Sequence, residues 1–150
     1  MNLFLDTSAL VKLYHEEAGT ENLSEFLYRY ADNLVITISD LSLTELHSAF
    51  LRRVRTGEIE QSVADEIFKG FDADAKMLNI VETDHVIKIF SVRILDVFGG
   101  KMSFRTLDAI QLSTAIISHQ TVPINYFVSS DKKLLKIAEK YFSIFNPEDV

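Results

Sequence analysis

The sequence predicts an α/β fold built around a mostly parallel sheet. Short apolar runs alternate along the chain with longer segments of helical period, which is typical of strands joined by crossover helices. Only two prolines and five glycines interrupt this pattern. A chain of 150 residues suits one domain, because it can bury about two thirds of its unfolded surface without help from a metal or a disulfide.

The apolar runs are expected to form five strands. The first run, Leu3 to Leu5, is continuous and too short for a core helix, which favours a strand that is buried on both faces. Comparable short runs recur at intervals that leave room for helices between them. The expected strands are residues 2–5, 34–38, 79–81, 126–128 and 143–145.

Seven intervening segments are expected to be helical. Gly57 separates the third from the fourth, and Gly99 and Gly100 end the fifth, because glycine accepts the left-handed conformation that ends helices. The expected helices are residues 8–15, 21–30, 43–55, 58–77, 84–98, 107–118 and 132–140. The sequence has no repeat, low-complexity tract or flexible linker, so we expect residues 1–150 to form a single domain.

Composition excludes several classes of protein. The absence of cysteine excludes a disulfide scaffold and thiolate metal sites. No apolar run approaches the roughly 18 residues that span a bilayer, and the start lacks a signal-peptide pattern, so we expect a cytoplasmic protein without a membrane partner. The net charge of −7 opposes binding of nucleic acid by surface charge alone, unless a cation neutralises part of it.

Four acidic residues fall where a strand ends or a helix begins: Asp6, Glu45, Asp108 and Asp131. In a parallel α/β fold these positions can meet at the carboxyl edge of the sheet. Each acid also has an ordinary explanation, since Asp6 and Asp131 can cap helices and Asp108 suits a helix N-terminus. Glu45 could close a capping box with Ser42.

Together the four acids predict a metal site. Grouped carboxylates repel, by about 4 kcal/mol for two charges about 4 Å apart at an effective dielectric near 20, so a cluster needs protons or a cation. Oxygen ligands suit Mg²⁺ or Mn²⁺, and the four histidines show no metal-ligand spacing. Such a cation can activate water against a phosphodiester. Thr7, Ser8 and Ser129 could support the site, although Thr7 and Ser8 could equally start a helix.

Four sequence segments carry a resemblance to a known family: LDTSALVKLY, SLTELHSAFLRR, RTLDAIQLSTA and FVSSDKKLL. In this order and spacing they resemble the PIN domain, and specifically the VapC-like toxins of bacterial and archaeal toxin–antitoxin pairs. The resemblance runs from residue 2 to about residue 135. It implies a three-layer α/β/α sandwich and a metal-dependent endoribonuclease, with Asp6, Glu45, Asp108 and Asp131 at the family's acidic positions.

The resemblance also implies partners. These are an RNA substrate, a second copy of the chain, and a small antitoxin whose C-terminal segment lies across the active site. The middle helices carry more large apolar side chains than one face of an isolated helix pair needs, namely Phe50, Phe68, Phe71, Met77, Ile89, Phe90 and Phe98. We expect residues 43–76 to contribute to the antitoxin or dimer surface.

Two other functions remain open at this point. A PIN-fold protein could be a non-catalytic interaction module with a structural metal or none. An aspartyl phosphotransfer protein would also carry an acid after the first strand, but the phosphatases of that class have a second Asp two positions on, where this chain has Ser8. Receiver domains need an acidic pair near the end of the first strand, and that pair is absent.

Overall fold

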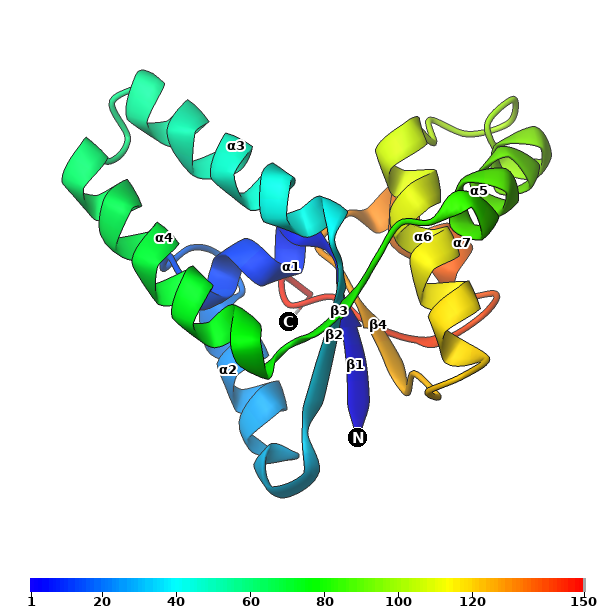
Figure 1. Ribbon diagram of the computed structural model, residues 1–150, viewed down its shortest axis with the longest axis horizontal. Coiled ribbons are helices and arrows are strands. Elements are labelled where there is room, and N and C mark those ends of the chain that lie inside the picture. Colours follow the sequence, from blue (N-terminus) through cyan, green and yellow to red (C-terminus); the bar gives the residue numbers. More distant parts are fainter. Residues whose placement is uncertain (150) are drawn as a thin grey trace.

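The computed structural model describes residues 1–149, and its centre is a five-stranded sheet in which all neighbouring strands are parallel (Figure 1). The strands are β1 (Asn2–Leu5), β2 (Val35–Ser39), β3 (Asn79–Val81), β4 (Tyr126–Val128) and β5 (Ser143–Phe145). Their order is β3-β2-β1-β4-β5. The chain begins at the centre, fills one side, and returns to fill the other, so the topological switch point lies between β1 and β4.

The central strand β1 explains the continuous apolar run. Its four residues are all buried, and Leu3 lies opposite Ile36 of β2 and Tyr126 of β4. A strand with neighbours on both edges and helices on both faces has no exposed side, so its apolar residues do not alternate with polar ones. All five predicted strands are confirmed. Four have the predicted bounds, and β2 lies one residue later because Ser39 still pairs with Val81.

Within residues 1–149, seven α-helices and three short 3-10 helices connect the strands. They are α1 (Thr7–Leu10), η1 (Val11–Leu13), α2 (Thr20–Tyr28), η2 (Ala31–Asn33), α3 (Leu41–Arg55), α4 (Gln61–Asp74), η3 (Ala75–Met77), α5 (His85–Phe98), α6 (Thr106–His119) and α7 (Lys132–Ala138). Every predicted helical segment overlaps one of these α-helices. The predicted helix over 8–15 is shorter than expected, because α1 tightens after one turn into η1. Within residues 1–149, no helix has the length and apolar character needed to cross a bilayer.

The glycines end two helices for different reasons. Gly57 has φ 75°, the left-handed conformation expected between α3 and α4. Gly99 does not, since its φ is −64°, and the expectation of a left-handed end there is wrong. A Cβ at Gly99 would lie 2.8 Å from the carbonyl oxygen of Leu95, so this position needs glycine because of close packing.

The sheet separates two hydrophobic cores. Leu3 and Leu5 point into the first, where they pack with residues of α1 to α4 such as Phe50, whereas Phe4 points into the second, which α5 to α7 cover. This alternation along one strand places helices on both faces, as Figure 1 shows. The three-layer α/β/α arrangement predicted for the chain is therefore present.

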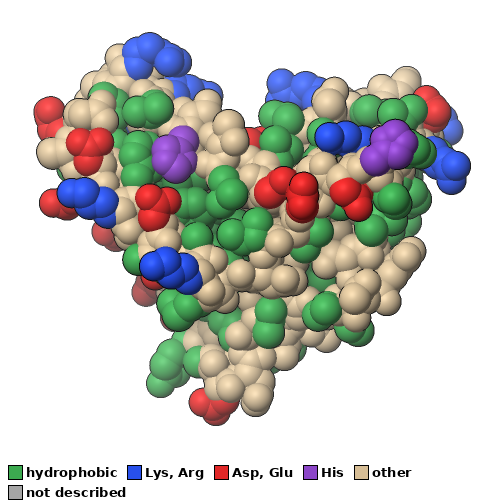
Figure 2. All heavy atoms as spheres, viewed as in Figure 1, with side chains coloured by type: hydrophobic (Ala, Val, Ile, Leu, Met, Phe, Trp, Pro, Cys, Tyr) green, Lys and Arg blue, Asp and Glu red, His purple; other side chains and the backbone are tan. Residues whose placement is uncertain are grey.

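The two helical layers extend beyond the carboxyl ends of the strands and leave a notch between them (Figure 2). Acidic side chains gather at the base of the notch, and Lys and Arg side chains lie toward the tips of both arms. The predicted site residues should therefore be sought at this edge of the sheet.

Candidate active site

Asp6 is the first residue after β1, and it caps helix α1. Its Oδ1 accepts hydrogen bonds from the backbone N–H of Ala9 at 3.0 Å and the hydroxyl of Ser8 at 2.7 Å. Its Oδ2 accepts from the hydroxyl of Ser129 at 2.7 Å. The side chain is buried, and this burial raises the pKa of Asp6 from 3.8 to about 6, although the three hydrogen bonds oppose the rise. Asp6 is thus a helix cap that also carries a perturbed carboxylate.

Glu45 does not close a capping box, so that interpretation is wrong. Helix α3 begins at Leu41, which places Ser42 inside the helix rather than at its N-cap. The Oε2 atom of Glu45 instead accepts a 2.6 Å hydrogen bond from the hydroxyl of Thr7 and a 2.8 Å hydrogen bond from the amide of Gln111. The carboxylate is therefore directed at the other elements of the site.

Asp108 and Asp131 both act as helix N-terminal residues, as their ordinary explanation predicted. Asp108 Oδ2 accepts from the backbone N–H of Arg105 at 3.0 Å, and Asp131 Oδ1 accepts from the backbone N–H groups of Lys133 and Leu134. Within residues 1–149, these hydrogen bonds involve one oxygen of each carboxylate. The second oxygen of each remains available to a ligand.

All four acids line one cavity of about 160 Å³ at the carboxyl edge of the sheet. The complete lining is Asp6, Thr7, Ser8, Glu45, Leu107, Asp108, Gln111, Asp131 and Leu134. The acids share this cavity but do not converge on one point, since no three acids or histidines among residues 1–149 lie close enough together to hold a metal ion directly. A hollow of about 550 Å³ lined by Met1 and residues 28–33 lies at the opposite ends of the strands and contains a single acid.

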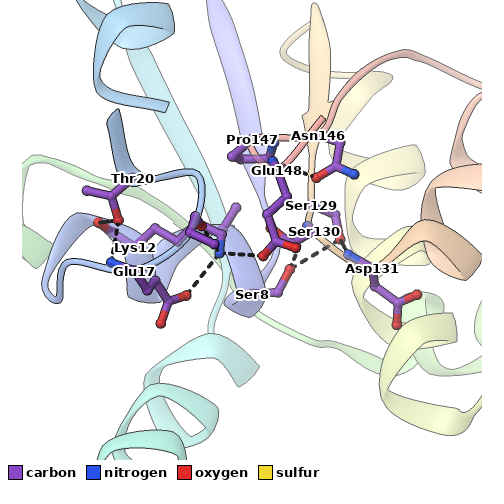
Figure 3. A network of polar contacts seen from close by, with 12 residues as sticks. Ser8, Lys12, Glu17, Thr20, Ser129, Ser130, Asp131, Asn146, Pro147 and Glu148 are labelled. Carbon is purple, nitrogen blue, oxygen red and sulfur yellow. Dashed lines mark hydrogen bonds and ion pairs between the residues drawn. The ribbon is translucent and has the colours of Figure 1, made fainter. Parts of the chain in front are cut away.

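Ser129 connects two of the acids, and Figure 3 shows its place in a wider polar network. Its hydroxyl donates to Asp6 and accepts from the backbone N–H of Asp131 at 2.9 Å. The hydroxyl of Ser8 accepts from the backbone N–H of Ser130 at 2.9 Å. The end of β4 is thereby held against the end of β1, at the switch point of the sheet.

A buried lysine extends the network toward the end of the chain (Figure 3). Lys12 is 3% exposed, and its Nζ contacts carboxylate oxygens of Glu17 at 3.0 Å and Glu148 at 2.8 Å, as well as the carbonyl oxygen of Ala18. Three acceptors satisfy the three N–H donors of an ammonium group. Lys12 therefore fixes the segment after β5 beside the first helix.

Three residues were not anticipated from the sequence as parts of this region: Gln111, Lys12 and Ser42. The hydroxyl of Ser42 lies 3.0 Å from the amide nitrogen of Gln111. Gln111 lies three residues after Asp108, and a helix brings such positions to the same face. A polar side chain between Ile110 and Leu112 was the available signal. Lys12 gave a similar signal within an apolar helical run.

The donor atoms of the cavity fit a hard cation. They are carboxylate and hydroxyl oxygens, none of the four histidines lines the cavity, and the chain has no cysteine. Mg²⁺ is commonly held by one or two carboxylates and keeps several waters, so the separation of the acids is compatible with it.

The sequence matches the PIN domain family over residues 3–140. No curated protein sequence matches the chain. Similar solved structures include VapBC2 from Rickettsia felis, described as bound to a DNA fragment from its promoter, with a TM-score of 0.70, 17% identity and coverage of 97% of this chain and 98% of that chain. Two other similar structures are each 14% identical to this chain. One is VapC20 from Mycobacterium tuberculosis, described as a sarcin-ricin loop cleaving toxin, with a TM-score of 0.64 and coverage of 90% of this chain and 94% of that chain. The other is a toxin–antitoxin complex from Klebsiella pneumoniae, with a TM-score of 0.65 and coverage of 99% of both chains.

At these identities the solved structures show a shared fold, and they agree with the parallel five-stranded sheet of this chain. The match of the family to residues 3–140 spans nearly the whole sequence. The chain therefore belongs to the PIN domain family.

Proposed function

We propose that this protein is a metal-dependent endoribonuclease that hydrolyses RNA phosphodiester bonds in the cytoplasm as the toxin of a toxin–antitoxin pair. The observation that carries this proposal is the single cavity lined by Asp6, Glu45, Asp108 and Asp131. It lies at the carboxyl edge of a parallel sheet, where ligands of open α/β folds bind. Membership of the PIN domain family supports the same chemistry.

The proposed cofactor is Mg²⁺, with Mn²⁺ as a substitute. Asp6, Asp108 and Glu45 would hold it directly or through water, and Asp131 would complete the cluster or orient a water. When bound, the cation would polarise the phosphate and lower the pKa of a water. Thr7 donates a hydrogen bond to one oxygen of Glu45, and Ser8 and Ser129 donate to the two oxygens of Asp6. The protein therefore holds both carboxylates in place before substrate arrives.

A separate hollow lies next to the cavity of the four acids and offers a place for the RNA. It has a volume of about 550 Å³ and shares Glu45, Leu107 and Asp108 with the smaller cavity. Arg105 also lines it, and a guanidinium binds phosphate oxygens through directed hydrogen bonds. A phosphodiester lying here would meet the positive charge of Arg105 despite the net charge of −7.

The test is cleavage of a panel of structured and single-stranded RNAs by purified protein. We expect cleavage with millimolar Mg²⁺, arrest by EDTA and recovery on adding excess Mn²⁺. Cleavage that continues in EDTA would contradict the proposed chemistry.

One observation favours a second candidate, a non-catalytic interaction module: no three acids among residues 1–149 meet at metal-binding distance. Calorimetry with Mn²⁺ separates the two candidates. The nuclease should bind the ion with heat that Asp6→Asn and Asp108→Asn reduce. A wild-type protein that takes up no Mn²⁺ at millimolar concentration would favour the module.

We also propose a small antitoxin and a second copy of the chain as partners. Solved structures with this fold include a toxin–antitoxin complex from Klebsiella pneumoniae. The helices α3 and α4 expose Leu51 and Val63, and η3 exposes Met77, which supports a contact surface in and just beyond residues 43–76. Hydrogen exchange of the chain with and without the protein encoded beside its gene tests this surface. Exchange in residues 43–76 should slow, and unchanged exchange there would remove this surface from the proposal.

A further inference from the structure

Gln111 joins the two helical layers of the fold at the carboxyl edge of the sheet. It lies on α6, whose Leu112 packs in the second core, and it contacts α3, whose Leu46 packs in the first. Its amide Nε2 lies 2.8 Å from Glu45 Oε2, 3.0 Å from Ser42 Oγ and 3.2 Å from Thr7 Oγ1. From α6, this one side chain therefore reaches both α1, which follows β1, and α3, which follows β2.

The orientation of this amide is set by its neighbours. An ionised carboxylate only accepts hydrogen bonds, so the Gln111 group that faces Glu45 must be the N–H donor. Thr7 donates to the same Oε2 atom, at 2.6 Å. Two donors thus fix Oε2 of Glu45, and within residues 1–149 no protein donor occupies Oε1.

Burial gives this contact its importance. Gln111 is 3% exposed, and its own carbonyl Oε1 is buried without a hydrogen-bond partner among the residues that the structure describes. Burying a carbonyl oxygen without a hydrogen-bond partner costs free energy. The hydrogen bonds that the amide N–H groups of Gln111 donate offset part of this cost. Gln111 also lines the cavity of the four acids, so this buried and only partly hydrogen-bonded amide lies at the site itself.

We propose that Gln111 is a positioning residue that holds the Glu45 carboxylate against Thr7 and presents its Oε1 to the cation and water of the cavity. This inference rests on the proposed metal-dependent function. Partners that orient metal ligands typically change metal affinity by about 10- to 100-fold when they are removed. Gln111 would act through Glu45 and would not itself touch the reacting atoms.

The first test is structural and needs neither metal nor RNA. Gln111→Met keeps an unbranched side chain of similar size and removes both donors. In a crystal structure of this variant, the Glu45 carboxylate should have left its place beside Thr7. A carboxylate that stays at hydrogen-bond distance from Thr7 would overturn the proposal, whatever the protein does to RNA.

The second test measures Mn²⁺ binding by calorimetry. Gln111→Met should weaken Mn²⁺ binding by about 10-fold or more, and the same substitution made in a Glu45→Gln background should add little to the loss. Ser113→Ala is the matched control, because Ser113 is a buried polar residue of the same helix with no hydrogen-bond partner among residues 1–149. Gln111→Asn, which is one methylene too short to reach Glu45, serves if the methionine variant does not fold.

The outcomes separate this proposal from the proposed function. Full Mn²⁺ affinity in a folded Gln111 variant, or losses that simply add to those of Glu45→Gln, would overturn the positioning role. Absence of RNA cleavage by the wild type would count against the nuclease, while a displaced Glu45 in the variant crystal would still support the positioning role.

Discussion

The hydroxyl of Ser129 donates a 2.7 Å hydrogen bond to Asp6, although the two residues lie 123 positions apart in the sequence. Asp6 follows β1 and Ser129 follows β4, so this bond spans the switch point of the sheet. The same hydroxyl accepts the backbone N–H of Asp131. The positions of two of the four cavity acids therefore depend on one buried serine.

Removing the Ser129 hydroxyl should destabilise the protein. Ser129→Ala leaves a buried carboxylate oxygen without its donor, and hydrogen bonds to charged groups contribute about 1.5–3 kcal/mol. We expect a loss of about 2 kcal/mol in the free energy of unfolding, measured with urea at pH 7. Ser130→Ala is the control, because the Ser130 hydroxyl has no hydrogen-bond partner among residues 1–149. Equal losses for both variants would contradict the assigned role of Ser129.

The raised pKa of Asp6 predicts a pH dependence of stability in the metal-free protein. Because the folded-state pKa is about 6 and the ordinary value is 3.8, the folded state binds the proton more tightly than the unfolded state does. The stability that this group contributes is therefore fully present below about pH 3.8 and is lost as pH rises through 6, by about 3 kcal/mol in total. Asp6→Asn should remove this component.

Urea unfolding in EDTA at a series of pH values measures this effect. The difference in stability between Asp6→Asn and the wild type should grow in favour of the variant from pH 4 to pH 6 and then level off. A difference that stays constant over this range would contradict the raised pKa of Asp6.

The buried ammonium of Lys12 should stabilise the fold more than an exposed one does. Lys12→Met leaves Glu17 and Glu148 without that partner, and we expect a loss of about 2 kcal/mol, less than for a fully buried pair because both acids are partly exposed. Lys132→Met is the comparison, since Lys132 and its partner Asp149 are 75% and 61% exposed and such pairs contribute little. Thermal unfolding of both variants checks the difference, and similar losses would contradict it.

The sequence predicted the sheet well because its signals are local. A continuous apolar run such as Leu3 to Leu5 reports burial on both faces, and the position of Asp6 after it follows from chain order alone. Both interpretations of Asp6 were needed, since it caps α1 and also lines the cavity. The acids at strand ends could therefore be assigned to one edge of the sheet from sequence.

What the sequence did not reveal depends on contacts between distant segments. The motif from Ser42 to Glu45 fits a capping box by spacing, but α3 begins one residue before Ser42, and Thr7 and Gln111 provide the donors for Glu45. Gln111 could be placed on the face of Asp108, yet nothing local indicated that this face meets α3. The distance between the acids, which decides how a cation is held, is likewise a property of tertiary packing.

The central claim is that the cavity acids act on RNA, and a comparison of three substitutions tests it most directly. Asp6→Asn and Asp108→Asn change acids that line the cavity, whereas Asp84→Asn changes an acid that caps α5 through Ile87 and lies outside the cavity lining. Asparagine caps helices about as well as aspartate, so the control fold should persist.

The measurement is the initial rate of RNA cleavage in Mg²⁺ by the four proteins, purified in parallel. The account predicts that the wild type and Asp84→Asn cleave at similar rates, while each cavity variant loses at least about 100-fold, a barrier increase of about 2.7 kcal/mol. Cleavage at the wild-type rate by folded Asp6→Asn and Asp108→Asn proteins would contradict it.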